Sequence, residues 1–355
     1  MDTQGRNFDF RDQSIYVGID VHRKSWRVTV LLGDYVQKTI NLSPPGVKPL
    51  TDYLFTHYPN GNYICAYEAG FSGFWAQEGL SAFGIKTMVL HPADIPTSDK
   101  ERQQKDDVRD SRKIAKSVKS GQVEGIFIPS KEQQCDRALV RRRWSLVSNR
   151  QRAMNRIKMH LHFMGKHPEG GVVEPWKWNK NFIKWLKEQA LKDRVLCSMI
   201  KELEYARQIE RELMRELRQL FSTQQYCGRM QLLRSVPGVG FLTAILLLTE
   251  IGEMNRFKTL DQLCFYAGLV PRTDSSGESE RADHRTSRGN KRLRTALIEC
   301  AWKSVQQDTE MALRYAELRR KMDGPHAIIK IARKVLNRIR RVWLTGQPYV
   351  RAENI

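Results

Sequence analysis

The first part of the chain alternates short apolar runs with stretches of helical periodicity. Runs of alternating or continuous apolar residues predict strands over residues 15–20, 26–32, 35–42, 63–67 and 86–90. Helical spacing of apolar residues follows Pro44-Pro45-Gly46 and recurs over 73–83 and 107–120. Three successive strands followed by alternating helices and strands predict an α/β domain with a mixed sheet, which we place at residues 1–130.

Residues 131–225 show long helical periodicity and predict a basic, coiled-coil-like helical arm. The stretch 131–164 is dense in arginine, and tryptophans alternate with lysines after it. Aromatic rings stack on bases while neighbouring cations meet phosphates, so we expect nucleic-acid contacts here. The candidate residues are Arg141, Arg142, Arg143, Arg150, Trp176 and Trp178. The stretch 191–220 alternates acids and bases, which is typical of a solvated helical hairpin, and we expect no ligand on it.

Residues 226–355 predict a mainly helical domain that opens with the segment LLRSVPGVGFLTAILLLTEIG. This pattern is typical of a helix-hairpin-helix, in which Gly238 and Gly240 let backbone N–H groups approach a DNA phosphate. The alternative is a tight glycine turn that packs a helix start against its neighbour. We expect a polar loop over 268–290 and basic helices from there to residue 345.

The charge balance points to a polyanionic partner. The chain carries 60 Lys and Arg against 39 Asp and Glu, a net charge of +21. Because this charge is spread over several segments, nucleic acid is favoured over a membrane surface. No apolar run is long enough to span a bilayer, no signal peptide is visible, and the six cysteines show no metal-binding or disulfide spacing. We expect a cytoplasmic protein that acts at the nucleoid.

Acidic residues stand where the predicted strands end. Asp20 ends the first strand and Glu68 the fourth, and Asp107 and Asp110 share one face of the helix that follows the fifth. Converging carboxylates repel one another unless a hard cation such as Mg²⁺ (or Mn²⁺) compensates them, and two such ions support phosphodiester chemistry. Taken alone, an Asp at a strand end is more often a turn or cap residue, and acids at a helix start more often only favour the helix dipole. Their conjunction in this strand order resembles the RNase H-like nucleases.

A serine pair stands in the predicted polar loop. Ser275-Ser276-Gly277 precedes a run of cations that includes Arg281, Arg285, Arg288, Lys291 and Arg292. A serine hydroxyl needs activation to act as a nucleophile, and cations around a phosphodiester would stabilise its transition state. By chemistry alone, a flexible loop beside a basic patch is the simpler interpretation.

Taken together, these motifs resemble a known family, the bridge-RNA-guided transposases of the insertion-sequence-110 type. The segments that carry the resemblance are YVGIDVHRKS, YEAG, KDDVRDSRKIA, VPGVGFLTAILLLTEIG, FYAGLVPRTDSSG and SRGNKRLRTAL. The resemblance implies a RuvC-like domain whose metal-binding tetrad is Asp20, Glu68, Asp107 and Asp110. It also implies that Ser276 is the catalytic serine, which becomes covalently joined to a DNA phosphate.

The resemblance further implies the partners and the assembly. Donor and target double-stranded DNA would be paired by an element-encoded guide (bridge) RNA, so that base pairing reads the sequence. One active site would combine the acid-bearing domain of one subunit with the serine-bearing domain of the other subunit of a dimer. Two dimers would form a tetramer. The family more often has Thr where this chain has Asp106, which makes Asp106 a rival of Asp107, and Ser275 is a rival of Ser276. The stretch from His167 to Phe182 matches no pattern.

The expected activity is therefore site-specific recombination of an insertion sequence through a phosphoserine intermediate. One alternative is a RuvC-like, metal-dependent, structure-selective endonuclease that forms no covalent intermediate. Another is a scaffold that binds nucleic acid without catalysis.

Overall fold

The computed structural model describes residues 9–96, 107–168, 178–276, 279–285 and 289–350, but not the side chains of 107–108 or 271–288. The chain divides into two compact units, residues 1–128 and 129–355. Across the described residues, we find no helix with the length and apolarity needed to cross a lipid bilayer.

The first unit is built on a five-stranded sheet with the order β3-β2-β1-β4-β5. β1 pairs antiparallel with β2 and parallel with β4, β2 pairs antiparallel with β3, and β4 pairs parallel with β5. The strands are β1 (Ser14–Val21), β2 (Trp26–Leu32), β3 (Tyr35–Leu42), β4 (Asn62–Glu68) and β5 (Lys86–Leu90). The mixed sheet predicted for the amino-terminal domain is confirmed.

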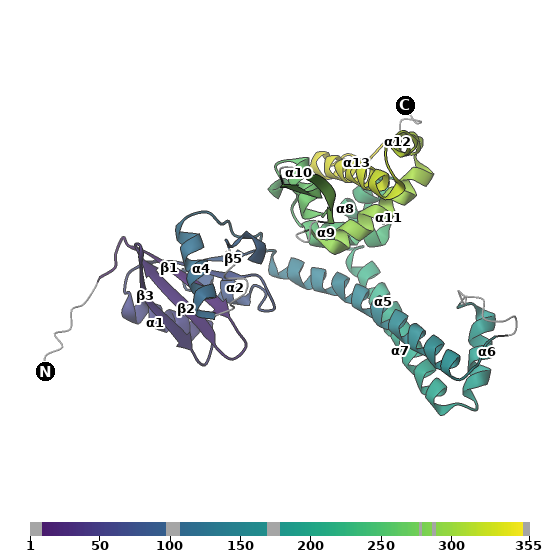
Figure 1. Cartoon of the computed structure of the whole chain (residues 1–355), viewed down its shortest axis with the longest axis horizontal. Coiled ribbons are helices and arrows are strands. Elements are labelled where there is room, and N and C mark those ends of the chain that lie inside the picture. Colours follow the sequence, from purple (N-terminus) through teal and green to yellow (C-terminus); the bar gives the residue numbers. More distant parts are fainter. Residues whose placement is uncertain (1–8, 97–106, 169–177, 277–278, 286–288, 351–355) are drawn as a thin grey trace. The chain divides into compact units, whose positions relative to one another are not determined.

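Helices cover both faces of this sheet (Figure 1). Alternate residues of β1, among them Val17 and Ile19, pack in one apolar cluster with residues of α1 and α2. The opposite face packs Ala66 of β4 in a second cluster with Ile114 and Val118 of α4. The helical segments of this unit are α1 (Val47–His57), α2 (Trp75–Ala82), the 3-10 turn η1 (Pro92–Asp94) and α4 (Asp107–Lys119).

The second unit begins with a long helical arm. Figure 1 shows α5 and α7 side by side, with α6 against α7. The outer half of the arm has its own small core, which includes Ile157, Phe182 and Ile200. The arm helices are α5 (Lys131–Phe163), α6 (Lys180–Ala190) and α7 (Arg194–Leu220).

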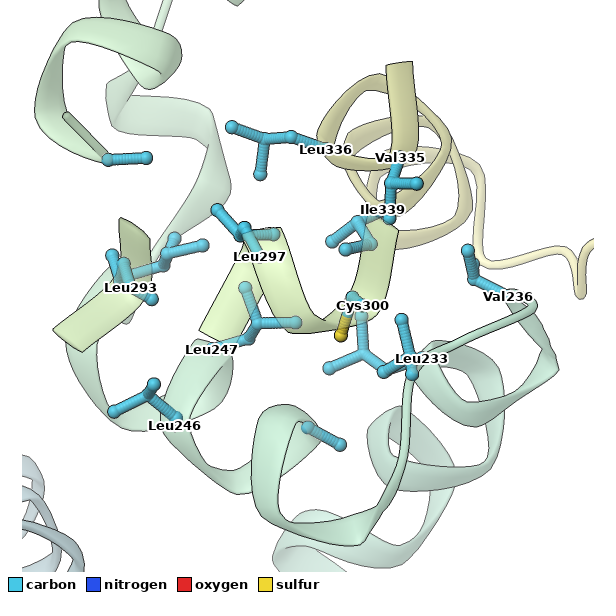
Figure 2. Packing of buried hydrophobic residues seen from close by; sticks show 14 of the residues in the cluster. Leu233, Val236, Leu246, Leu247, Leu293, Leu297, Cys300, Val335, Leu336 and Ile339 are labelled. Atoms are coloured by element: carbon cyan, nitrogen blue, oxygen red, sulfur yellow. The ribbon is translucent and has the colours of Figure 1, made fainter. Parts of the chain in front are cut away.

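The rest of the second unit is a helical domain whose core also receives residues from the base of α5 and α7. Figure 2 shows the centre of this core, where side chains from four helices meet. Leu247 of α9 lies beside Leu297 of α11, and residues of α8 and α13 belong to the same cluster. The helical segments are α8 (Gln224–Ser235), α9 (Phe241–Ile251), η2 (Met254–Arg256), α10 (Leu260–Tyr266), α11 (Lys291–Gln307), α12 (Thr309–Arg319) and α13 (Gly324–Thr345).

The polar loop expected over 268–290 is wrong for most of its length, because a β-hairpin lies there. β6 (Pro271–Ser276) and β7 (Ser279–Arg285) form a two-stranded antiparallel sheet in which Ser276 pairs with Ser279. These strands carry neither an apolar face nor Val and Ile, which are the signals that predict a strand. The hairpin is therefore defined here by its backbone pairing.

Candidate active site and nucleic-acid-binding residues

Two of the predicted acids lie side by side at one edge of the sheet. β1 and β4 are parallel neighbours, and Ile19 pairs with Tyr67. The next residues along the two strands are Asp20 and Glu68, so they share one register position and one face of the sheet. The Glu68 residue is exposed, and the side chain of Asp20 is 21% exposed, so both carboxylates can reach a ligand outside the sheet.

The direction of α4 brings the acidic helix start to the same edge. At the end of the helix, Lys119 pairs with Asp34 in the turn between β2 and β3, which lies next to the first residues of β1. The helix therefore runs antiparallel to β1, and its first turn lies toward the strand end that carries Asp20. Asp110 belongs to this turn, and Asp107 begins the helix, although the Asp107 side chain lies outside the described residues. The rival ligand Asp106 also lies outside them.

A close backbone contact fixes α4 against the sheet. A Cβ added to Gly18 would lie 2.0 Å from the Ser111 carbonyl oxygen, so only glycine admits the helix at this distance. Beside it, the buried Ser111 hydroxyl lies 2.8 Å from the Thr29 hydroxyl, which in turn lies 3.0 Å from that of Thr39. Gly18 and Asp20 point to the same face of the sheet. The contact at Gly18 therefore sets how closely α4 approaches the face that carries Asp20.

The acids at this edge already have basic neighbours. His22 Nε2 lies 2.9 Å from Asp20 Oδ2, and Lys113 Nζ lies 3.6 Å from Asp110 Oδ1. His22 was not among the predicted site residues. The spacing Asp-Val-His at the end of a strand was its available signal, because alternate residues of a strand point to the same side.

Carboxylate oxygens are the donors that Mg²⁺ and Mn²⁺ accept, so the chemistry of the predicted set fits a hard divalent cation. Within the residues whose side chains the structure describes, however, no three His, Cys, Asp or Glu are grouped closely enough to hold a metal ion. Asp20, Glu68 and Asp110 are therefore not assembled as a coordination shell, and the position of the Asp107 carboxylate is not described.

The predicted nucleophile occupies the end of a strand. Ser276 is the last residue of β6, and Ser275 pairs with Glu280 across the hairpin. Arg281 and Arg285 lie on β7, opposite Asp274 and Pro271. The side chains of these hairpin residues lie outside the described part of the chain, as does all of Arg288. Two further predicted cations are exposed in the first turn of α11, namely Lys291 and Arg292.

The two predicted hairpin glycines have different surroundings. Gly238 has a φ of +88°, and an added Cβ would lie 2.4 Å from the carbonyl oxygen of Cys300 in α11. Its N–H donates to Gln307 Oε1 at 3.2 Å, so this glycine has a packing role between α9 and α11. Gly240 is the N-cap of α9, is exposed, and has no atom within 4 Å of an added Cβ. Of the two, Gly240 leaves the room that a phosphate needs at a helix start.

Several of the arm arginines predicted to bind nucleic acid have carboxylate partners inside the protein. Arg141 donates through Nε and one Nη to the two carboxylate oxygens of Glu250. Arg150 Nε lies 2.9 Å from Glu210 Oε2. Arg143 is half-buried, and burial lowers its pKa. Arg142 is exposed. These positions are therefore not equivalent, and Arg142 has the most open surroundings.

Of the two predicted tryptophans, Trp176 lies outside the described residues. Trp178 packs edge-on against Phe182, with ring centres 5.1 Å apart, and the Arg207 guanidinium lies 5.8 Å from the centre of its ring. Trp178 is thus held at the arm surface beside a cation.

Comparison with known protein families gives the affiliation of the chain. A family model for DEDD-type IS110 transposases matches residues 17–165. This range includes the end of the sheet where Asp20, Glu68 and the start of α4 lie, which we call the acid edge. A second model, described as the transposase IS116/IS110/IS902 family, matches residues 230–316, which include the α8–α9 turn and the hairpin.

Individual relatives have the same affiliation. The y4qE protein of Sinorhizobium fredii is 30% identical over 242 residues, which is 68% of this chain and 58% of the relative. The transposase for insertion sequence element IS1111A of Coxiella burnetii is 30% identical over 61% of this chain and 58% of its own length. The transposase for element IS1533 of Leptospira borgpetersenii is 24% identical over 95% of this chain and 97% of its own length. The chain spans less than two thirds of the first two relatives and nearly all of the third. With both of its matched segments assigned to transposases of one type, the chain belongs to the IS110/IS116 family of transposases.

Proposed function

We propose that this protein is an RNA-guided DNA recombinase that moves an insertion sequence through a covalent phosphoserine intermediate. The observation that carries the proposal is the acid edge of the first unit, the end of the sheet at which Asp20, Glu68 and the start of α4 lie. We assign this unit to the RNase H-like, RuvC-like class on the basis of its sheet order and these acids. The family match over both units supports the activity on DNA.

In the proposed reaction, Ser276 Oγ attacks a DNA phosphorus and the bond from phosphorus to one deoxyribose oxygen breaks. The serine proton leaves Oγ, and the released deoxyribose oxygen takes up a proton. Religation is the reverse step, in which a deoxyribose hydroxyl from the second DNA attacks the phosphoserine. One phosphodiester is exchanged for another, so the reaction needs no nucleotide hydrolysis.

The acid edge would hold Mg²⁺ or Mn²⁺ through the carboxylates of Asp20, Glu68, Asp107 and Asp110. When bound, such ions neutralise the phosphate and stabilise charge on the attacking and leaving oxygens. His22 orients the Asp20 carboxylate from the side through its 2.9 Å contact. Gly18 keeps α4 close enough for the helix start to contribute.

The acid edge lies in the first unit and Ser276 in the second, so one phosphodiester has to meet both units. We propose that the two come from different subunits of a dimer, and that two dimers bring donor and target DNA together. An element-encoded RNA would select both DNAs by base pairing, while the exposed cations Arg142, Lys291 and Arg292 contact phosphates.

The test uses purified protein co-expressed with RNA from the element's flanking sequence, end-labelled donor DNA and Mg²⁺. Denaturing gels run with and without protease should show a protease-sensitive protein–DNA adduct. The adduct should be lost in Ser276→Ala and in Asp20→Asn but kept in Ser275→Ala, the matched control. Cleavage without an adduct that survives Ser276→Ala would overturn the phosphoserine mechanism and favour a metal-dependent nuclease.

A further inference from the structure

A long groove runs along the arm on the surface of α7. It has a volume of about 1260 Å³ and is lined by residues of α5, α6 and α7 together with Trp178. From Lys201 to Arg218 its α7 side extends for ~26 Å at the rise of an α-helix. The alternating acids and bases of this helix favoured a solvated surface without a ligand, and the lining of the groove gives reason to reconsider that prediction.

The groove is strongly basic because cations outnumber acids in its lining. Its lining contains six cations and two acids. The cations are Arg150, Lys201, Arg207, Arg211, Arg215 and Arg218. The acids are already paired, since Lys187 lies 2.7 Å from Glu204 and Arg150 lies 2.9 Å from Glu210.

The remaining α7 cations keep their charge available for a ligand. Arg211, Arg215 and Arg218 are exposed, and in the described part of the chain no carboxylate forms an ion pair with any of them. They are spaced four and three residues apart, so they follow one face of the helix as a continuous stripe. A stripe of unpaired cations on one helix face is the arrangement that tracks a polyanionic backbone.

Aromatic rings stand in the same groove. The Tyr205 residue is 65% exposed, and Trp178 is held in place by Phe182 with Arg207 beside its ring. An exposed ring can stack on a base while the cations beside it bind the phosphate of that nucleotide. The base is open to such stacking only if it is not already stacked in a duplex. The groove therefore favours a single strand over a double helix.

We propose that this groove binds a single-stranded stretch of RNA. Gln208, Glu204 and the Tyr205 hydroxyl line the groove between the cations, and their oxygens can accept a hydrogen bond from a ribose 2′-hydroxyl, which DNA lacks. This inference rests on the proposed RNA-guided function and names the surface of the arm that would hold unpaired guide RNA. The binding partner is thus recognised by its phosphates, its open bases and its 2′-hydroxyls.

The test measures the affinity of the full chain for a fluorescent 12-nucleotide single-stranded RNA at several salt concentrations. The double variant Arg211→Gln/Arg215→Gln should flatten the slope of log K against log salt by about 1.4, because two phosphate contacts are lost. Tyr205→Ala should raise Kd about fivefold or more through the loss of one stacked base. The matched control Arg320→Gln/Lys321→Gln removes the same charge from exposed positions after α12 and should leave both quantities unchanged.

Competition identifies the ligand, and crosslinking identifies the site. Unlabelled single-stranded RNA should compete better than single-stranded DNA, duplex RNA of the same length or poly-glutamate. An RNA carrying 4-thiouridine should crosslink to the peptide with Trp178 or Tyr205. Equal competition by any of the other polyanions, crosslinks confined to other peptides, or equal effects of the control and groove variants would overturn the proposal.

The two proposals fail in distinguishable ways. If the groove variants leave RNA binding intact while the wild-type protein still forms the Ser276 adduct, the groove assignment alone is wrong. If no adduct forms although the groove binds RNA as expected, the recombination mechanism is wrong and the groove assignment stands.

Discussion

The ion pair between Arg141 and Glu250 connects the arm to the core of the second unit and offers a quantitative test of the fold. Arg141 Nε and a second guanidinium nitrogen each donate to one carboxylate oxygen of Glu250 at 2.7 Å. Asn290, the N-cap of α11, donates to the same carboxylate at 2.9 Å. The Glu250 side chain is 1% exposed, whereas that of Arg141 is 41% exposed.

This asymmetry predicts unequal costs for removing the two partners. Arg141→Ala leaves a buried carboxylate with only its remaining donors, and we expect a loss of about 3 kcal/mol in the free energy of unfolding. Glu250→Gln keeps the shape of the side chain and leaves Arg141 able to bind water, so we expect a loss of about 1–2 kcal/mol. For a unit of this size, Arg141→Ala should lower Tm by ~6–12 °C and Glu250→Gln by ~2–8 °C.

The assay is scanning calorimetry of the full chain, in which the transition of the second unit is followed. The double variant Arg141→Ala/Glu250→Gln should lose less than the sum of the single losses, because it leaves no buried charge unpaired. Arg142→Ala, one residue away and exposed, is the control and should change Tm little. Equal losses for the two single variants, or strict additivity, would refute the reasoning from burial.

The same pair predicts a dependence on pH. Burial acts to raise the pKa of Glu250, but the hydrogen bond and the charge of Arg141, together with Arg137 and Asn290, outweigh it and lower the pKa below its ordinary value of 4.5. As pH falls, the Glu250 carboxylate is therefore protonated in the unfolded chain before it is protonated in the folded protein. The stabilisation from the ion pair is complete above the ordinary pKa of Glu250 and is lost as pH falls through its lowered pKa in the folded protein. The difference in Tm between the wild type and Glu250→Gln should shrink below pH 4.5.

Four further substitutions test the packing and capping around the site and the arm. Gly18→Ala places a Cβ 2.0 Å from the Ser111 carbonyl oxygen, so it should destabilise the first unit by roughly 1–3 kcal/mol or more and abolish adduct formation, as measured by calorimetry and the gel assay. Gly238→Ala meets both a φ of +88° and the Cys300 carbonyl at 2.4 Å, so it should lower the Tm of the second unit. Gly240→Ala meets no atom and loses only the N-cap preference for glycine over alanine, so it should lower Tm less. Asp193→Ala removes the N-cap of α7 and should cost about 1 kcal/mol. The backbone N–H of Leu196, with His160 and Lys166, lowers the pKa of Asp193 to about 2, so circular dichroism should show arm helicity falling between its ordinary value of 3.8 and pH 2.

The fold of the first unit was predictable because its strands carry a burial signal. Ile15, Val17 and Ile19 alternate with residues that face the other side, and turn residues separate the strands. The positions of Asp20 and Glu68 followed from strand order alone, since parallel neighbours end at one edge. The depth at which α4 packs was not predictable, because it depends on the absence of a side chain at Gly18.

In the second unit, several features could not be predicted from the hydrophobic pattern of the sequence. The β6–β7 hairpin was missed because its residues are polar and no apolar face marks them as strands. The pairing of Arg141 with Glu250 joins residues 109 positions apart, and no local pattern separates such an arginine from one that faces nucleic acid. The basic stripe on α7 was masked in the sequence by the acids that alternate with it, two of which line the groove but are paired with Lys187 and Arg150.

The most direct test of the central claim is to identify the residue that carries the DNA. The adduct formed on donor DNA with Mg²⁺ is digested with nuclease and trypsin, and the modified peptide is sequenced by mass spectrometry. We predict a nucleotide phosphate on Ser276, and no modified peptide when Asp20→Asn replaces the wild type. A modification on Ser275 or on another residue, or an adduct that persists in Asp20→Asn, would contradict a phosphoserine mechanism that depends on the acid edge.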